Sequence, residues 1–296
     1  MVKTIDLNFL GKDEAIASFI IPTSEGPVLV ETGPYSTYPN LEKAIELAGY
    51  KVSDVKHVLL THIHLDHAGA AWKFAEMGAT IYMHPFGKRH MVDPSKLMAS
   101  ARMIYKDQMD VLWGDMKNIP EEKIVEVQDD QVFQFGDTEI KAWYTPGHAK
   151  HHIAWQLGDS LFTGDVAGVK IGNGPVVSPC PPPDINLEDW KVSLDLIRKI
   201  APARLFLTHY GEITEVEAHL DALEKDLHTV ANWIRARMKP RVDVLELTKE
   251  FNAFCQEELR KQGVDEVGIA QYDAANPAWM SVAGLMRYWT KKAEIV

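Results

Sequence analysis

Four potential metal ligands lie within six residues in the segment Thr61-His62-Ile63-His64-Leu65-Asp66-His67. The apolar run His57-Val58-Leu59-Leu60 precedes it and predicts a strand that ends where the ligands begin. In a tight turn after a strand, side chains two residues apart can converge on one metal ion while their neighbours reach a second. Imidazole and carboxylate suit zinc, and the same donors accommodate iron or manganese. The segment therefore predicts metal binding, with zinc as the first choice of metal.

Three later segments each supply one more ligand after an apolar run. Ile140-Lys141-Ala142-Trp143-Tyr144 alternates like a strand and leads into Thr145-Pro146-Gly147-His148. Two further strand-like runs lead to Asp165 and to His209. A histidine or aspartate at a strand end is more often a turn former or a capped polar group, so each segment is weak alone. Their order behind the first motif indicates one metal centre.

This ordered set resembles the metallo-β-lactamase superfamily in its THxHxDH form. The resemblance implies an α/β fold, a four-layer αβ/βα sandwich with the metals at one rim between its two sheets. It also implies two divalent metal ions with three ligands each and one shared ligand, namely His62, His64 and His148 for the first ion, Asp66, His67 and His209 for the second, and Asp165 as the bridge. His152 fills a position that is commonly a supporting histidine behind the ligands.

The expected chemistry follows from two adjacent metal ions. Ions about 3.5–4 Å apart can share a water and lower its pKa to near neutrality, which would make a metal-bridging hydroxide the nucleophile. One ion would polarise the oxygen under attack while the other stabilises the leaving group. Asp66 would steer the proton to the departing atom. We therefore predict a binuclear metal-dependent hydrolase that attacks an ester-like bond, with a thioester or a lactone as the first candidates.

Other activities stay open. The segments ending in His148 and Asp165 look most like glyoxalase II-type thioesterases, but no basic cluster for glutathione carboxylates is evident. Gly168 stands where acyl-homoserine lactonases often carry a tyrosine. A mononuclear iron enzyme of the persulfide dioxygenase type, with two histidines and one carboxylate, is the main alternative from another class. A phosphodiesterase and a non-catalytic protein with a structural metal are the others.

Composition narrows the partners and the location. The net charge of −11 disfavours a nucleic-acid or anionic-membrane surface, so a small-molecule substrate is expected. No run of about 18 apolar residues occurs, and Met1-Val2-Lys3-Thr4-Ile5-Asp6 lacks the apolar core of a signal peptide. We therefore expect a cytoplasmic protein. Two cysteines, Cys180 and Cys255, give no disulfide framework.

The chain divides into a catalytic domain at 1–211 and a helical extension at 212–296. Long helical runs are predicted at 212–238, 242–262 and 276–292, with Pro240 between the first two. The extension would either cap the site or form a homodimer surface through its aromatic residues. Within the catalytic domain, 85–122 is a methionine-rich, partly helical insertion that would act as a lid or pack as core. A Gly/Pro-rich loop at 166–184 should border the metals.

Overall fold

The strands form two six-stranded sheets in a computed structural model that describes residues 1–239 and 242–295. The first sheet has the order β1-β2-β3-β4-β5-β6 and the second β12-β11-β10-β9-β8-β7. The first consists of β1 (Lys3–Asp6), β2 (Ala17–Thr23), β3 (Gly26–Val30), β4 (His57–Leu59), β5 (Thr80–Met83) and β6 (Ile124–Glu126). The second consists of β7 (Val132–Phe135), β8 (Thr138–Tyr144), β9 (Ile153–Leu157), β10 (Ser160–Phe162), β11 (Arg204–Leu207) and β12 (Gly211–Ile213).

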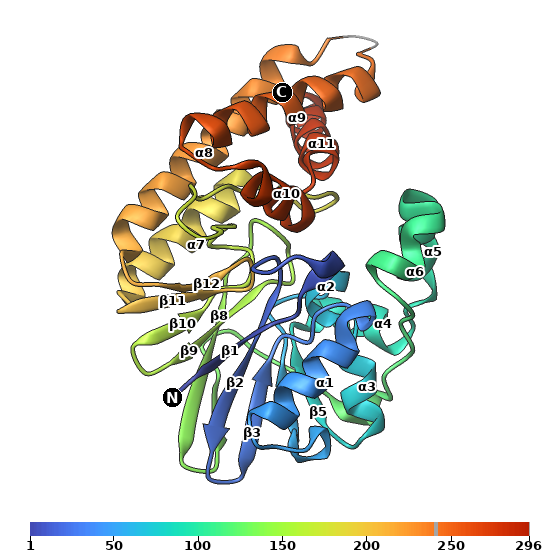
Figure 1. Cartoon of the computed structure of the whole chain (residues 1–296), viewed down its shortest axis with the longest axis vertical. Helices are drawn as coiled ribbons and strands as arrows, with labels where there is room; N and C mark the ends of the chain where they lie inside the picture. The colour runs from blue at the N-terminus through green and yellow to red at the C-terminus, as the bar shows by residue number, and fades with distance from the viewer. Residues whose placement is uncertain (240–241, 296) are drawn as a thin grey trace.

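Helices cover the outer face of each sheet, and a further group lies beyond the rim (Figure 1). The helices before the second sheet are α1 (Tyr38–Leu47), α2 (Leu65–Ala68), α3 (Ala71–Glu76), α4 (Pro85–Val92), α5 (Ser95–Tyr105) and α6 (Met109–Leu112). Those after it are α7 (Leu187–Ile200), α8 (Val216–Arg237), α9 (Val244–Lys261), α10 (Glu266–Ala275) and α11 (Ala278–Ile295). No helix in the described ranges combines the length and apolarity needed to cross a bilayer.

Alternating side chains explain why both sheets are buried on two faces. In β2, Phe19 packs between the two sheets while its neighbour Ile20 packs against the helices of the first sheet. In β3, Val30 and Leu29 divide in the same way. A third apolar cluster lies between the second sheet and α7 and α8. Three apolar layers therefore separate four structural layers, which is the predicted αβ/βα arrangement.

The helical region after residue 211 differs in detail from the prediction. The first long helix begins at Val216 rather than at 212, because residues 211–213 pair antiparallel with β11 as the edge strand β12. The short helix α10 was not predicted. Its stability depends on burial of Ile269 and Tyr272 against the loop around Ile171, a contact far away in sequence. Pro240, predicted to separate two helices, lies outside the described residues.

Candidate metal centre

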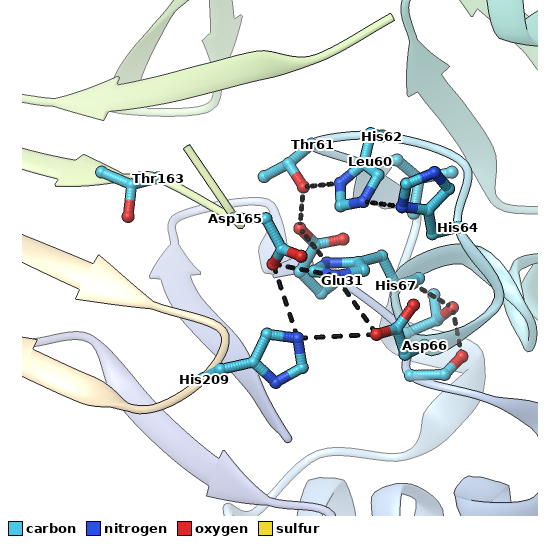
Figure 2. A network of polar contacts seen from close by, with 12 residues as sticks. Glu31, Leu60, Thr61, His62, His64, Asp66, His67, Thr163, Asp165 and His209 are labelled. Carbon is cyan, nitrogen blue, oxygen red and sulfur yellow. Dashed lines mark hydrogen bonds and ion pairs between the residues drawn. The ribbon is translucent and has the colours of Figure 1, made fainter. Parts of the chain in front are cut away.

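All seven predicted ligands gather at one rim of the sandwich, where strands of both sheets end. Figure 2 labels all of them except His148. The chain leaves β4 at Leu59, turns through His62 and His64, and begins α2 with Asp66 and His67 close to its N-terminus. The remaining three follow strands of the second sheet, namely His148 after β8, Asp165 after β10 and His209 after β11.

The first cluster consists of three histidine nitrogens that converge on one point. The Nε2 atom of His62 lies 2.9 Å from the Nδ1 atom of His64. The Nε2 atom of His148 lies 3.1 Å from the same Nδ1 atom. Three imidazole nitrogens around one point are a donor set typical of a catalytic divalent metal with a further open position.

The second cluster combines one carboxylate with two histidines. Oδ2 of Asp66 lies 3.5 Å from Nε2 of His209 and 3.7 Å from Nε2 of His67. Asp66 is the most exposed member, since a fifth of its side chain (20%) reaches solvent whereas the histidine side chains are at most 1% exposed. This cluster therefore opens to the outside through its carboxylate.

Asp165 stands between the two clusters and turns one oxygen toward each. Its Oδ2 atom lies 3.3 Å from Nε2 of His148 in the first cluster. Its Oδ1 atom lies 3.1 Å from Nε2 of His67 and 3.4 Å from Nε2 of His209 in the second. This division of one carboxylate is the geometry that the predicted bridging role requires.

The donor set fits divalent cations. Within the described part of the chain, Nε2 of His67, Nε2 of His209 and Oδ1 of Asp165 are buried without a hydrogen-bond partner. Buried polar atoms without partners are costly, and a shared metal ion would satisfy all three. The assignment of the seven residues as metal ligands stays a prediction, although the fold brings all of them together.

Partners behind the ligands orient four of the five histidines. Nδ1 of His148 donates to the carbonyl of Pro179 (2.9 Å), and Nδ1 of His209 donates to the carbonyl of Ala15 (2.7 Å). Fixing the proton on Nδ1 leaves Nε2 as a free lone pair that faces the cluster. Nδ1 of His62 lies 3.0 Å from Oγ1 of Thr61, within hydrogen-bond distance. Nδ1 of His67 lies 3.2 Å from Oε1 of Glu31, an ion-pair contact when the histidine is protonated.

Glu31 supports the first motif from beneath. It is fully buried, adopts a left-handed backbone (φ 63°), and accepts a hydrogen bond from the hydroxyl of Thr61. A left-handed conformation at a residue other than glycine costs about 1–3 kcal/mol and is retained where the surroundings require it. Here the requirement is contact with both Thr61 and His67 from one carboxylate.

His152 lies behind Asp165, as the resemblance implies. Its Nδ1 atom is 2.8 Å from the hydroxyl of Thr145, and its Nε2 atom accepts a hydrogen bond from the backbone N–H of Asp165 (3.3 Å). The side chain is fully buried, so it links the loop after β8 to the loop after β10. Its contacts suit a positioning residue rather than a ligand.

The two clusters differ in protonation when no metal is bound. Burial and the neighbouring histidines lower the pKa of His62 far below its usual value and that of His64 to about 3. Burial opposes protonation of His67 as well, but Asp165 and Asp66 raise its pKa well above the usual value. A metal entering the first cluster meets neutral histidines, whereas one entering the second must displace protons.

Residues 11–209 match the family described as the metallo-beta-lactamase superfamily. The chain belongs to the metallo-beta-lactamase superfamily. The predicted membership in this superfamily is therefore confirmed.

Curated relatives match only in part. The metallo-beta-lactamase fold-containing protein ST1585 from Sulfurisphaera tokodaii is 32% identical over 170 residues, which are 55% of this chain and 64% of that protein. The atrochrysone carboxyl ACP thioesterase of Aspergillus fumigatus is 24% identical over 208 residues, which are 69% of this chain and 39% of that protein. The chain thus spans less than two thirds of the length of these relatives.

Solved structures extend the likeness over nearly the whole chain. An archaeal metallo-beta-lactamase superfamily protein from Sulfolobus tokodaii has a TM-score of 0.68 at 21% identity and covers 96% of this chain and 98% of its own. A metallo-beta-lactamase family protein from Thermus thermophilus has a TM-score of 0.70 at 18% identity, with coverage of 99% and 93%. At this identity the likeness concerns the fold, and the predicted sandwich with C-terminal helices is confirmed.

A cavity of about 1250 Å³ opens beside the metal centre of this superfamily member. His64, Asp66, His148 and Asp165 line its floor. Its walls come from the predicted insertion, from the proline run at 181–183 and from the start of α11. This volume exceeds the roughly 300–1,000 Å³ of ordinary ligand pockets, so a long substrate can be enclosed.

The methionines of the insertion are mostly core residues. Four of the five, namely Met91, Met98, Met109 and Met116, are buried, and Met103 is exposed. The cavity is instead lined by other side chains of the same segment, among them Tyr105 and Trp113. The insertion therefore packs against the sheet with its methionines and forms a wall of the cavity with other side chains. Its function as a lid stays a prediction.

Of two histidines outside the ligand set, one caps a helix and the other lines the cavity. His84 follows β5, accepts a hydrogen bond from the N–H of Phe86 (3.1 Å) and caps α4, so its role is structural. His151 lines the cavity with its ring 5.8 Å from that of His64, a position that the sequence did not single out. The only indication of His151 in the sequence was its position next to His152 and three residues after His148.

The C-terminal helices hold the loop that orients His148. On α8, the half-buried Asp226 accepts hydrogen bonds from both the N–H and the hydroxyl of Ser178 (both 2.7 Å). On α10, the Tyr272 hydroxyl donates to the carbonyl of Pro175 (2.6 Å). On α11, Gly284 approaches so closely that an added Cβ would lie 2.0 Å from the carbonyl oxygen of Cys180. These contacts flank Pro179, whose carbonyl accepts from His148.

Proposed function

We propose that the protein binds two divalent metal ions, with zinc as the first choice, and hydrolyses an ester-like bond in a thioester or a lactone. Three residues would hold each ion and one would bridge them: His62, His64 and His148; Asp66, His67 and His209; and Asp165. The observation that carries the binuclear part is the divided carboxylate of Asp165, which lies 3.1–3.4 Å from histidine nitrogens of both clusters. A site for one ion would need only one of these oxygens as a ligand.

Bound ions would act as Lewis acids and would lower the pKa of a water molecule. Proton transfer would fall to a residue of the chain itself. Nearby His67 and His209 overcome the effect of burial and lower the pKa of Asp66 to about 2, so its carboxylate is ionised and reaches the cavity. Asp66 would accept a proton at a carboxylate oxygen and pass it to the departing atom. An Asp66→Asn variant with both metals and nearly full turnover would contradict this role.

Two observations support an ester-like substrate. The relative from Aspergillus fumigatus is described as an acyl carrier protein thioesterase. The cavity walls include Phe86, Leu97 and Trp113, which suit an acyl group better than a charged nucleotide. A small-molecule substrate, a cytoplasmic location and a homodimer stay predictions. Two side chains of α11 that could have formed a dimer surface, Leu285 and Tyr288, are buried within the chain.

Metal analysis beside a substrate panel tests the proposal. Protein purified without chelator should contain two metal ions per chain and should cleave thioesters or lactones faster than phosphodiesters. Asp66→Ala and His209→Ala should each lower the metal content. A firm value of one ion, unchanged in both variants, would overturn the binuclear assignment and favour a mononuclear iron enzyme instead. Phosphodiester cleavage alone would overturn the choice of bond.

A further inference from the structure

The cavity beside the metal centre has an aromatic end. Tyr105 packs edge-on against Trp113 (ring centroids 5.1 Å apart) and against Trp279 of α11 (5.6 Å). Trp113 in turn stacks on Phe9 (5.7 Å). These four rings line the cavity and come from three segments far apart in sequence. Such a surface binds an apolar chain without demanding hydrogen bonds from it.

The cavity also has a cationic end. Arg89 from α4, Lys96 from α5 and Lys150 from the loop after His148 all line it. Throughout the described ranges, none of these three cations has a carboxylate within 4 Å; the guanidinium of Arg89 contacts only His90, at 3.1 Å. In a chain with a net charge of −11, three unpaired cations on one cavity are a local reversal of charge. Sequence alone did not reveal this cluster because its members come from three segments.

Few carboxylates oppose these cations. Apart from the predicted metal ligands, the acidic side chains lining the cavity are Asp184 and Asp273. Asp273 already accepts a hydrogen bond from Gln256 (3.1 Å). Asp184 lies on the cationic side, where it opposes the effect of Arg89 and Lys96 on the pKa of His90. Apart from the predicted metal ligands, three cations and two carboxylates line the cavity, which leaves one positive charge in excess.

The helix α5 connects the two ends. Lys96 lies in its first turn and Tyr105 at its last residue, with Leu97 and Ala101 on the same face toward the cavity. Nine residues of helix at about 1.5 Å each separate the ends by roughly 13 Å. Tyr105 lies close enough to Asp66 that this carboxylate adds to burial in raising the tyrosine's pKa, and Lys150 is two residues from His148. Four of the predicted metal ligands, His64, Asp66, His148 and Asp165, line the same cavity as the aromatic and cationic side chains.

Building on the proposed function, we propose that the substrate is an acyl thioester whose acyl chain occupies the aromatic end and whose thiol leaving group carries a carboxylate or phosphate at the cationic end. In the reaction, water adds its oxygen to the acyl carbon and the carbon–sulfur bond breaks. The acyl group leaves as a carboxylate, the leaving group departs as a thiol, and one proton is released to solvent. The charge pattern thus selects the leaving group, while the aromatic rings select the acyl chain.

Matched pairs of octanoyl thioesters test this charge selection on the metal-loaded enzyme. Pantetheine and 4′-phosphopantetheine differ by one phosphate, and N-acetylcysteamine and N-acetylcysteine differ by one carboxylate. We expect kcat/KM for the charged member of at least one pair to exceed that of its neutral twin roughly tenfold at low salt, and the preference to shrink above about 0.3 M salt. The pair that responds identifies the anion. Equal rates within both pairs would overturn the charge selection, whereas no cleavage of any thioester would overturn the proposed function itself.

Substitutions then locate the effect. In an Arg89→Gln/Lys96→Gln variant, the ratio of charged to neutral kcat/KM should fall toward one. Arg102→Gln is the matched control, because Arg102 lies on the same helix as Lys96, is paired with Asp110 (3.7 Å) and does not line the cavity. If the control lowered the ratio as much as the double variant, overall charge rather than the cavity would be responsible. The salt dependence of the unaltered enzyme supplies the second measurement should the double variant fail to fold.

Discussion

The two sheets contribute to the metal centre in different ways. The first sheet supplies His62 to His67 from one turn, and this turn is supported by Glu31 at the end of the adjacent strand. The second sheet supplies His148, Asp165 and His209 from three separate loops. Their supports come from distant parts of the chain, such as the carbonyl of Ala15 behind His209. One half of the site is a local motif, and the other half is assembled by the tertiary fold.

The two halves should therefore differ in robustness. A turn held by its neighbours forms whenever the first sheet forms. In the second half, His148 also depends on the loop at 175–183, which the C-terminal helices contact through Asp226, Tyr272 and Gly284. The helical extension therefore belongs to the structural support of the metal centre as well as to the cavity wall. Substitutions in the two halves should fail in distinguishable ways.

Asp165→Ala should cause the largest loss, because it removes the one residue that contacts both ligand clusters. Without its carboxylate, charges in both clusters are left uncompensated, so we expect fewer than two metal ions per chain and a fall in kcat/KM of about three orders of magnitude. His152→Ala, which removes only a support behind Asp165, should cost about 10–100-fold. Elemental analysis and kcat/KM of both variants provide the measurement. Equal activity in the two would contradict the bridging role.

Glu31→Ala should weaken the second cluster more than the first. The substitution removes the partner of Nδ1 of His67 and of the Thr61 hydroxyl, so metal affinity should fall about 10–100-fold at the second cluster and less at the first. Metal titration after chelation separates the two affinities. Glu76→Gln, a change at an exposed glutamate on α3, serves as the control. A uniform loss at both clusters would contradict a specific effect of Glu31 on His67.

The same contrast explains what the sequence could predict. Ligand residues stand directly after apolar runs, so their number, type and order were readable, and the sandwich followed from the resemblance they carry. The carbonyls behind His148 and His209 could not be found, because a backbone oxygen has no sequence signature and its position depends on the tertiary fold. The cationic end was also missed, because only the tertiary fold brings Arg89, Lys96 and Lys150 to one cavity. Helix α10 was missed because its apolar face is short and is stabilised by the loop around Ile171.

Trp113→Ala should alter chain-length selectivity at the cavity. Each buried methylene contributes about 0.8 kcal/mol, so the unaltered enzyme should prefer octanoyl over butanoyl thioesters by up to about two orders of magnitude. Removing the indole should lower that preference by roughly tenfold. Met109→Ala is the matched control, since Met109 belongs to the same segment but is buried in the core and does not line the cavity. An equal loss on short and long substrates in the Trp113 variant would mean that the segment is not a substrate wall.

Asp226→Asn should produce the smallest effect, on the pH dependence of stability. Burial raises the pKa of Asp226 to about 6 although Ser178 donates two hydrogen bonds to its carboxylate. The folded state holds this proton more tightly than the unfolded chain does, since an unfolded aspartate has a pKa near 3.9. The stability that the proton provides is therefore lost as the pH rises from about 4 through the folded pKa of about 6. Between about pH 5 and 7.5 the unaltered protein should lose about 1 kcal/mol more unfolding free energy than the variant, since partial exposure weakens the effect. Denaturant unfolding of both chelated proteins gives the difference, in which the titration of the shared metal-site histidines cancels. Parallel pH profiles would show that Asp226 is ionised at little cost, and the loop that orients His148 would then be held through Tyr272 and α11 instead.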